Sequence, residues 1–519
     1  MIINLFKILL MLYMMLMCVM MNIFFFSNSQ SIIILNEMFF NFNKNITFVL
    51  DVYSMGYSLI ILIVVINVIN FMNIYMFFNL NLKKFFFMTK MFIFSMFLLV
   101  YSFNLWTMIV GWEGLGMSSF YLIFYYNNYE SWKSAMKTFI NNKMGDSLLI
   151  LSMIFMEMNE EKTKMMFFLI LAMLTKSAQF PFMAWLPMAM SAPTPISAMV
   201  HSSTLVTAGL FITFRLMNNF FMKMNLNFFM NLCMMSMFVS GMMALMEKDM
   251  KKMIALSTLS QISLIFFFLL NNFKVMAFIY MCNHALFKSL MFINMGIMMK
   301  TNFSSQLKFN MKNTSMESMY LLSFKMSCFN LMNLSFFSSF FIKEKMLLQL
   351  ESGMLMNIKL MIFLVNSFLT MNYSLKMIFF FNNNNFFKKE NITIKSKNYK
   401  VSFFIMNIFS MIFSKSCMEI MLSMNMMNLW MVFFYVFSML INFKMYKNKF
   451  LFINSMLYLN FIMFMGPMKV LNYKLEMIEL WMEKLSLNFY FLMKNKIMVK
   501  SFNMNYKLIL ILMLMFMFI

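Results

Sequence analysis

Titratable side chains interrupt long apolar segments of this sequence, where a charge is costly. A charged group at the centre of a lipid bilayer costs about 2.5–3.5 kcal/mol on insertion scales, so each such residue is a candidate for function. Imidazole both donates and accepts hydrogen bonds, and a row of imidazole and amine groups therefore suits proton transfer. The candidates are Glu113, Lys176, His201, His284, Lys288 and Lys343.

The local sequence around these residues indicates how helices would position them. In G-W-E-G-L-G, Glu113 stands among glycines that let neighbouring helices approach closely. In N-H-A-L-F-K, His284 and Lys288 are four residues apart and share one helical face. In F-F-I-K-E-K, Lys343 and Glu344 lie near the end of a later apolar segment.

The stretch Thr175–Gly209 collects helix-breaking residues next to Lys176 and His201. It holds four of the five prolines of the chain and one of its two histidines. Proline removes a backbone donor, so a membrane helix is predicted to break after Lys176, and the freed carbonyls could bind cations or water. Hydroxyl residues beside His201 could hold further waters. The prolines are Pro181, Pro187, Pro193 and Pro195.

Each candidate also has a purely structural interpretation. Glu113 could be a protonated carboxyl in a helix seam, and Lys176 could extend to the membrane interface from a simple proline kink. His201 could be a structural histidine, and Lys343 an interfacial anchor. The residues alone leave these alternatives open.

The composition predicts an all-α polytopic membrane protein. The chain has 519 residues, 62% hydrophobic and 12% charged, and roughly fifteen apolar runs are long enough to span a bilayer. The segments expected are N-terminal transmembrane helices (1–84), a core (85–381), further transmembrane helices (382–467), an amphipathic helix lying along the membrane or partner helices (468–502), and a final span (503–519).

Several classes of function are excluded by what the sequence lacks. Its net charge of +24 is spread over short connections, which favours contact with lipid headgroups over nucleic-acid binding. The five cysteines have no C-x-x-C spacing, two histidines do not make a metal site, and no glycine-rich phosphate loop is present. We therefore expect no metal or cofactor to be bound by this chain.

Codon bias indicates an AT-rich mitochondrial gene. The chain holds 79 methionines, as expected if AUA is read as methionine. Residues with GC-rich codons are scarce, yet four of six tryptophans, five of ten glycines, four of five prolines and the single arginine lie within 106–215. This segment has kept residue types that the codon bias removes elsewhere. We therefore expect the functional residues to lie there.

Taken together, the motifs resemble the chain 5 family of mitochondrial NADH–ubiquinone oxidoreductase, the largest antiporter-like membrane subunits of respiratory complex I. The resemblance spans about 50–345 and rests on G-W-E-G-L-G-M-S-S-F, K-S-A-Q-F-P-F-M-A-W-L-P, A-P-T-P-I-S-A-M-V-H-S-S-T, K-D-M-K-K-M-I-A-L-S-T-L-S-Q and N-H-A-L-F-K. It implies two inverted repeats with discontinuous helices and a lateral C-terminal helix.

The resemblance also assigns roles to the candidate residues. Glu113 and Lys176 correspond to the ion pair of the family. The onward relay corresponds to His201, His284, Lys288 and Lys343, with Asp146 and Glu344 as supporting acids.

By the same resemblance, the chain is a translocase subunit of complex I that carries no redox centre. Quinone reduction in partner subunits, which hold NAD, FMN, iron–sulfur clusters and ubiquinone, would drive it. The partners implied are neighbouring antiporter-like subunits, accessory subunits and inner-membrane lipids such as cardiolipin.

One alternative is a subunit of an Mrp-type cation/proton antiporter. The other is a structural role, with the helix at 468–502 as a clamp.

Two positions depart from the pattern of the family. A histidine four residues before His284 is replaced by Tyr280. The second broken helix of the family has Gly and Pro before the position of Lys343, whereas this chain has L-M-N-L-S-F-F-S-S-F-F-I-K. A break there would depend on Asn and Ser.

Overall fold

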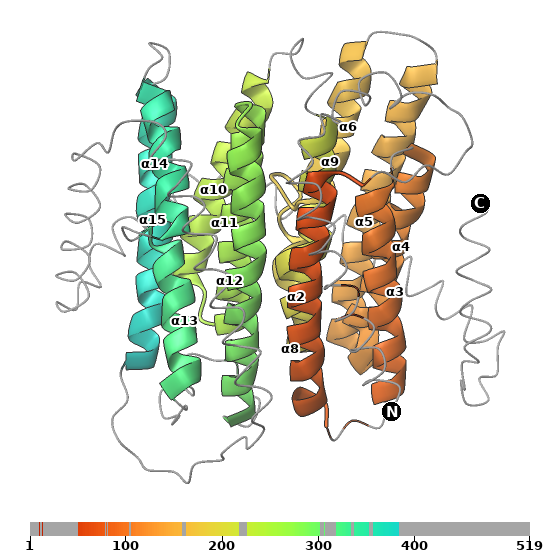
Figure 1. Ribbon diagram of the computed structural model, residues 1–519, viewed down its shortest axis with the longest axis vertical. Coiled ribbons are helices and arrows are strands. Elements are labelled where there is room, and N and C mark those ends of the chain that lie inside the picture. The colour runs from red at the N-terminus through yellow and green to blue at the C-terminus, as the bar shows by residue number, and fades with distance from the viewer. Residues whose placement is uncertain are drawn as a thin grey trace. The chain divides into compact units, whose positions relative to one another are not determined.

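The computed structural model describes residues 50–382, with Leu10 and Tyr13, apart from short gaps at 78, 80, 103–104, 158–161, 217–225, 302–305, 307–317, 334–336 and 352–356. All of these lie in one compact unit, and every element described in them is a helix (Figure 1). The segments predicted at 382–467, 468–502 and 503–519 lie outside the described residues, apart from Asn382.

The helices run nearly without interruption along the described chain. Their bounds are α2 Val52–Tyr75, α3 Leu82–Tyr101, α4 Leu105–Ile123, η3 Phe124–Tyr126, α5 Tyr129–Glu157, α6 Lys162–Lys176, α7 Trp185–Met188, η4 Ala189–Ser191, α8 Thr194–Ile196, η5 Ser197–Thr204, α9 Leu205–Leu216, α10 Asn227–Met246, α11 Met250–Leu270, α12 Lys274–Thr301, α13 Ser318–Leu331, α14 Ser338–Glu351 and α15 Asn357–Asn382.

Within the described residues, six helical segments are long and apolar enough to cross a membrane. They differ in how far the protein itself buries them: the apolar window of α11 is wholly buried, whereas those of α3 and α10 are half-buried. A helix that is apolar all round belongs in an interior or in lipid. Exposed apolar side chains on the outer helices, such as Phe94 and Trp106, are therefore suited to face lipid.

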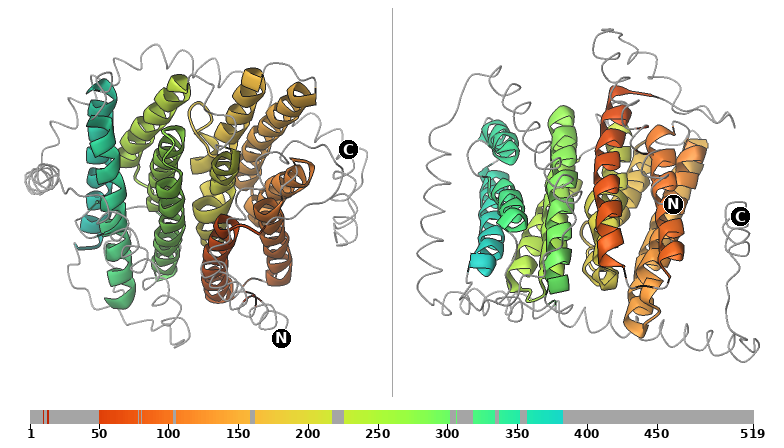
Figure 2. Two further views of the ribbon diagram at one scale, coloured as in Figure 1. Left: turned by 45° about the horizontal axis from the view of Figure 1, so that its top comes forward. Right: turned by 60° about the horizontal axis from the view of Figure 1, so that its bottom comes forward.

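Helix α12 occupies the middle of the arrangement. It packs against α2 and η5 on one side and against α11, α13 and α14 on the other. Figures 1 and 2 show α13–α15 on one side of it and α3–α5 on the other. Helices that are consecutive in the chain pack in pairs, with α3 against α4, α5 against α6, and α10 against α11. The candidate residues of α12 thus lie between the two outer groups of helices.

The first predicted break is present, but it begins earlier than the prolines indicate. Helix α6 ends at Lys176, and the left-handed backbone of Ala178 (φ 55°) redirects the chain before Pro181 is reached. The helix resumes as α7 at Trp185. The chain therefore leaves helical geometry directly after the lysine, at the position where a break after Lys176 was predicted.

A second break precedes Lys343 despite the lack of proline and glycine. Helix α13 ends at Leu331, Asn333 adopts a left-handed conformation (φ 60°), and α14 begins at Ser338. Asparagine tolerates this region better than most residues. The Ser339 hydroxyl donates to the Asn330 carbonyl, which satisfies an acceptor that the end of α13 leaves free. The chain therefore forms two helices here, α13 and α14, with a break before Lys343 as the resemblance implied.

Candidate functional site

Lys176 ends α6 with its side chain completely buried in the protein. Its ammonium donates a hydrogen bond to the Trp112 carbonyl at 3.1 Å and lies 4.6 Å from the centroid of the Trp112 ring. Gly116 of α4 lies beside this ammonium, and a Cβ there would be in ordinary van der Waals contact with Lys176 Nζ, at 3.5 Å. A carbonyl and an aromatic face thus stabilise the buried charge.

The acidic residues near Lys176 are gathered around Lys143 of α5. Lys143 Nζ lies 3.5 Å from Glu113 Oε1 and 3.1 Å from Asp146 Oδ2. The Trp112 indole N–H donates to Asp146 Oδ1 at 2.7 Å. Trp112 therefore contacts both Asp146 and Lys176. Where the resemblance pairs Glu113 with Lys176, the structure places Lys143 against Glu113.

His201 lies in a buried π-helical turn. Segment η5 spans Ser197–Thr204, and the Thr204 hydroxyl donates to the carbonyl of Met199, five residues earlier. Single π-helical turns are frequent at functional sites. Within the described residues, neither ring nitrogen of His201 has a hydrogen-bond partner. A buried imidazole in this state is suited to bind water on both sides.

The hydroxyls that were expected to hold water beside His201 are engaged by the protein. Ser203 and Thr207 donate to carbonyls of their own helix, and the Tyr57 hydroxyl contacts the Ser203 carbonyl at 2.9 Å and Thr207 Oγ1 at 2.5 Å. The donors of these hydroxyls are therefore occupied, and water near His201 would bind the imidazole or donate to a hydroxyl oxygen.

Lys251 of α11 is a buried cation that the sequence pattern did not single out. Its ammonium donates to the carbonyl of Ala192, where the chain enters α8, and its charge interacts with His201. In the sequence it stands in K-D-M-K-K, which has the composition of a connecting loop. Only the burial of Lys251, at 2% exposed, distinguishes it from its exposed neighbour Lys248.

The α12 residues predicted to share a face do so, and both are fully buried. Lys288 Nζ donates to Ser257 Oγ of α11 at 2.6 Å. Both ring nitrogens of His284 lack a hydrogen-bond partner within the described residues. A proton on His284 would repel one on Lys288, and protons on Lys288 and Lys343 would repel each other in the same way.

Lys343 of α14 is buried like the other lysines, beside the buried Glu344. Its ammonium has no hydrogen-bond partner in the part of the chain that the structure describes. An ammonium in this position needs water or a mobile partner to remain charged.

Together the candidates form three clusters from one end of the helix array to the other. Glu113, Asp146 and Lys176 lie with Lys143 and Trp112 on α4–α6. His201 lies with Lys251 in the middle, and His284, Lys288 and Lys343 lie on α12 and α14. The described residues contain no group of three His, Cys, Asp or Glu side chains that could hold a metal ion. This chemistry suits the movement of protons rather than bond making.

Broken helices carrying buried lysines define the class of antiporter-like membrane proteins. Residues 102–370 match the family described as "NADH:quinone oxidoreductase/Mrp antiporter, TM". The chain belongs to this family.

Curated relatives named NADH-ubiquinone oxidoreductase chain 5 agree with this assignment. The chain is 36% identical to the protein of Anopheles quadrimaculatus over 64% of its length and 61% of the relative. It is 37% identical to that of Ascaris suum, over 64% and 63% respectively, and 35% identical to that of Caenorhabditis elegans, over 74% and 73%. The first two alignments thus span about three fifths of those relatives.

Solved structures share the fold at low sequence identity. One belongs to the membrane-bound sulfane sulfur reductase, an archaeal respiratory membrane complex, with a TM-score of 0.60 and 18% identity over 70% of this chain and 80% of that chain. Another belongs to the Mrp complex of Dietzia sp. DQ12-45-1b, with a TM-score of 0.56 and 19% identity over 69% and 42%.

Proposed function

We propose that this chain is a core membrane-arm subunit of a proton-pumping NADH:ubiquinone oxidoreductase in the mitochondrial inner membrane. The observation that carries the proposal is Lys176, fully buried at a helix break and hydrogen-bonded to the Trp112 carbonyl. The names of the curated relatives support the assignment to complex I. Protons would pass along Glu113, Lys176, His201, His284, Lys288 and Lys343, with Asp146 and Glu344 as supporting acids.

Glu113 and Asp146, which form the acid cluster around Lys143, offer a way to protonate and deprotonate Lys176. A carboxylate close to a buried amine stabilises its protonated form, and loss of that carboxylate favours release. Because Lys143 contacts both Glu113 and Asp146, it competes with Lys176 for these carboxylates. A change in which lysine they pair with would therefore move a proton onto or off Lys176.

The energy for this step comes from outside the chain in our proposal. Moving one charge against about 200 mV costs roughly 4–5 kcal/mol, at about 2.3 kcal/mol per 100 mV. Quinone reduction in partner subunits would supply it, and those subunits would hold NAD, FMN, iron–sulfur clusters and ubiquinone. The chain would then be a translocase subunit, with about fifteen spans, among neighbouring antiporter-like and accessory subunits and lipids such as cardiolipin.

Two inverted repeats are part of the proposal. The pairs α6 with α7 and α13 with α14 support them, since each is a helix interrupted close to a buried lysine. Inverted repeats with broken helices place binding sites near the middle of the membrane.

The substitution Lys176→Met tests the proposal in the assembled complex. We expect NADH-driven proton pumping to fall by about a hundredfold, as for the loss of a proton-transfer group. NADH oxidation by an artificial acceptor should persist. The matched control is Lys84→Met, which removes an exposed lysine from α3. Pumping at the unsubstituted rate in Lys176→Met would overturn the proposal.

A second candidate is a subunit of an Mrp-type cation/proton antiporter. The description of the matching family includes such antiporters, and the fold is similar to that of an Mrp complex. Purification from membranes separates the two candidates, because only the first predicts that quinone-reducing subunits co-migrate with this chain.

A further inference from the structure

Side chains of the first break hold the carbonyls on both sides of Lys176. The end of an α-helix leaves carbonyls that have no partner within the helix. The Trp185 indole N–H donates to the Thr175 carbonyl at 3.1 Å, and Gln179 Nε2 donates to the Ser177 carbonyl at 3.1 Å. At these two positions the carbonyls that were expected to bind cations or water are therefore engaged by the protein.

Gln179 is itself held by α10, a helix further along the chain. The Ser236 hydroxyl donates to Gln179 Oε1 at 2.6 Å, and both side chains are completely buried. The direction of this bond is fixed, because the amide nitrogen faces the Ser177 carbonyl and the amide oxygen only accepts. The hydroxyl also lies 2.8 Å from the Cys233 carbonyl, so two acceptors share its single hydrogen.

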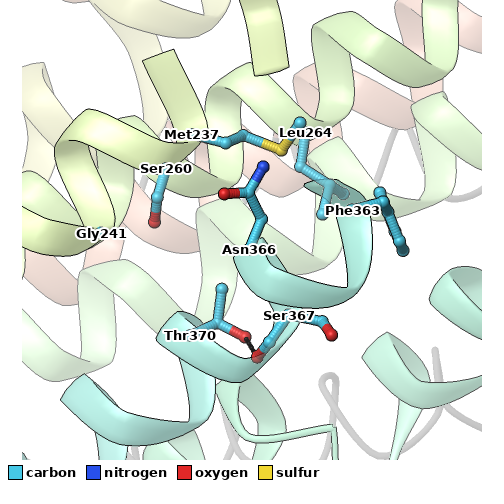
Figure 3. Close-up of a pocket in the computed structure, with 8 residues that line it drawn as sticks. All are labelled: Met237, Gly241, Ser260, Leu264, Phe363, Asn366, Ser367 and Thr370. Carbon is cyan, nitrogen blue, oxygen red and sulfur yellow. Dashed lines mark hydrogen bonds between the residues drawn. The ribbon is translucent and has the colours of Figure 1, made fainter. Parts of the chain in front are cut away.

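Helix α10 is a firm anchor for this contact. It packs against both α11 and α15. Figure 3 shows the Asn366 amide of α15 extending toward Met237, the residue that follows Ser236. Asn366 Nδ2 donates to the Met234 carbonyl at 3.4 Å. Ser236 is thus carried by a helix that two neighbouring helices hold in place.

We propose that Gln179 and Ser236 are positioning residues, which fix the end of α6 so that the Lys176 ammonium reaches the Trp112 carbonyl. The inference rests on the proposed function, in which Lys176 carries a proton. Gln179 holds the carbonyl of the residue that follows Lys176, and Ser236 holds Gln179. A displaced helix end would draw the ammonium away from the Trp112 carbonyl, and a separation of 3.1 Å is already near the upper limit for a hydrogen bond.

Packing of α9 leaves the end of α6 little room to move. A Cβ at Gly209 would lie 3.6 Å from both Lys176 Cβ and the Ser177 nitrogen. The backbone of Lys176 is therefore held by α9 and, through Gln179, by α10. Its proton is then released by a change in the charges around the ammonium rather than by movement of the break. The charged side chains that interact with Lys176 are Glu113, Lys143 and Asp146, on α4 and α5.

Two serines of α10 provide the first test in the assembled complex. Ser236→Ala leaves Gln179 Oε1 buried without its donor, so we expect NADH-driven pumping to fall roughly fivefold. The alkaline limb of the pH profile of pumping should move to lower pH, because an ammonium that has lost its carbonyl releases its proton more readily. The matched control is Ser240→Ala, one turn further along α10, whose buried hydroxyl donates only to carbonyls of its own helix in the described structure.

A double variant separates positioning from packing. Gln179→Met has a side chain of similar length but makes neither hydrogen bond. If Ser236 acts through Gln179, the variant with both Gln179→Met and Ser236→Ala should pump as slowly as Gln179→Met alone, whereas independent packing defects would multiply. If Gln179→Met does not assemble, Ser236→Ala still decides the question, because it removes a single oxygen atom.

Electron microscopy at high resolution adds a measurement that does not depend on pumping. We expect the Gln179 amide between the Ser177 carbonyl and Ser236 in the unsubstituted complex, and a longer Lys176–Trp112 contact in Ser236→Ala. Unchanged pumping and pH profile in Ser236→Ala, multiplied losses in the double variant, or a Gln179 amide directed away from Ser236 would each overturn the inference. Normal pumping in Lys176→Met would overturn the proposed function instead, whereas the position of Gln179 is decided independently of it.

Discussion

The carbonyl of Trp112 accepts the hydrogen bond of the buried Lys176 ammonium at 3.1 Å, in a position where an ion pair with Glu113 was expected. The same tryptophan donates its indole N–H to Asp146 at 2.7 Å. Trp112 therefore connects the ammonium to the acid cluster without a direct contact between opposite charges. A carbonyl holds a cation less tightly than a carboxylate does, which favours a lysine that must release its proton.

The first prediction concerns the indole N–H of Trp112. Trp112→Phe retains the carbonyl and an aromatic face for Lys176 but removes the donor to Asp146. An unsatisfied buried acceptor costs about 1–3 kcal/mol, so we expect pumping to fall by at least roughly fivefold while the complex still assembles. Proton pumping per NADH oxidised is the measurement. Trp106→Phe on the exposed face of the same helix is the control, and an equal effect of both changes would contradict the role of Trp112.

The second prediction concerns Lys143, which contacts Glu113 and Asp146 together. In Lys143→Met both carboxylates become available to Lys176 and hold it protonated, so pumping should slow. Because 37% of the Lys143 side chain is exposed, the effect is expected to be modest, roughly twofold to fivefold. Lys143→Arg should retain most of the rate. Faster pumping in Lys143→Met would show that Lys143 does not compete for the acids.

Sequence patterns predicted the helical class, the first helix break and the burial of the lysines and histidines of the relay, whereas the second break was implied only by the family resemblance. These features follow from residue type, because apolar length predicts spans and a charge within a span predicts an interior position. The hydrogen-bond partners of the charged groups were harder to predict from the sequence. Lys176 binds a backbone carbonyl, which every residue possesses, so no residue pattern indicates it.

Lys251, at the start of α11, was missed for a related reason. Lysines near helix ends usually reach the membrane interface, and nothing in K-D-M-K-K distinguishes the buried Lys251 from its exposed neighbour Lys248. The cause of the first break was also misidentified. Prolines were taken as its cause, whereas the left-handed backbone at Ala178 lies before Pro181.

A third prediction tests how the second break forms without glycine or proline. Asn333 adopts a φ of 60°, which costs an ordinary L-residue about 1–2 kcal/mol. Asn333→Ala should therefore lower the thermal midpoint of the purified complex, whereas Asn333→Gly should keep or raise it. Glycine accepts this conformation and also removes a buried amide that has no partner among the described residues. The reverse order of the two midpoints would show that the Asn333 side chain, and not its backbone, forms the break.

The last prediction uses two glycines that approach Lys176 from different helices. A Cβ at Gly209 of α9 would lie 2.9 Å from the Met173 carbonyl oxygen, a rigid backbone atom, whereas one at Gly116 of α4 would meet only side-chain atoms at 3.5 Å or more. Alanine gains about 0.8–1 kcal/mol over glycine in a helix interior, but overpacking costs about 1–3 kcal/mol. Gly209→Ala should therefore lower the thermal midpoint and Gly116→Ala should raise it slightly. If both variants are stabilised, α9 and α6 can separate freely beside Lys176, and the close packing inferred for the first break is wrong.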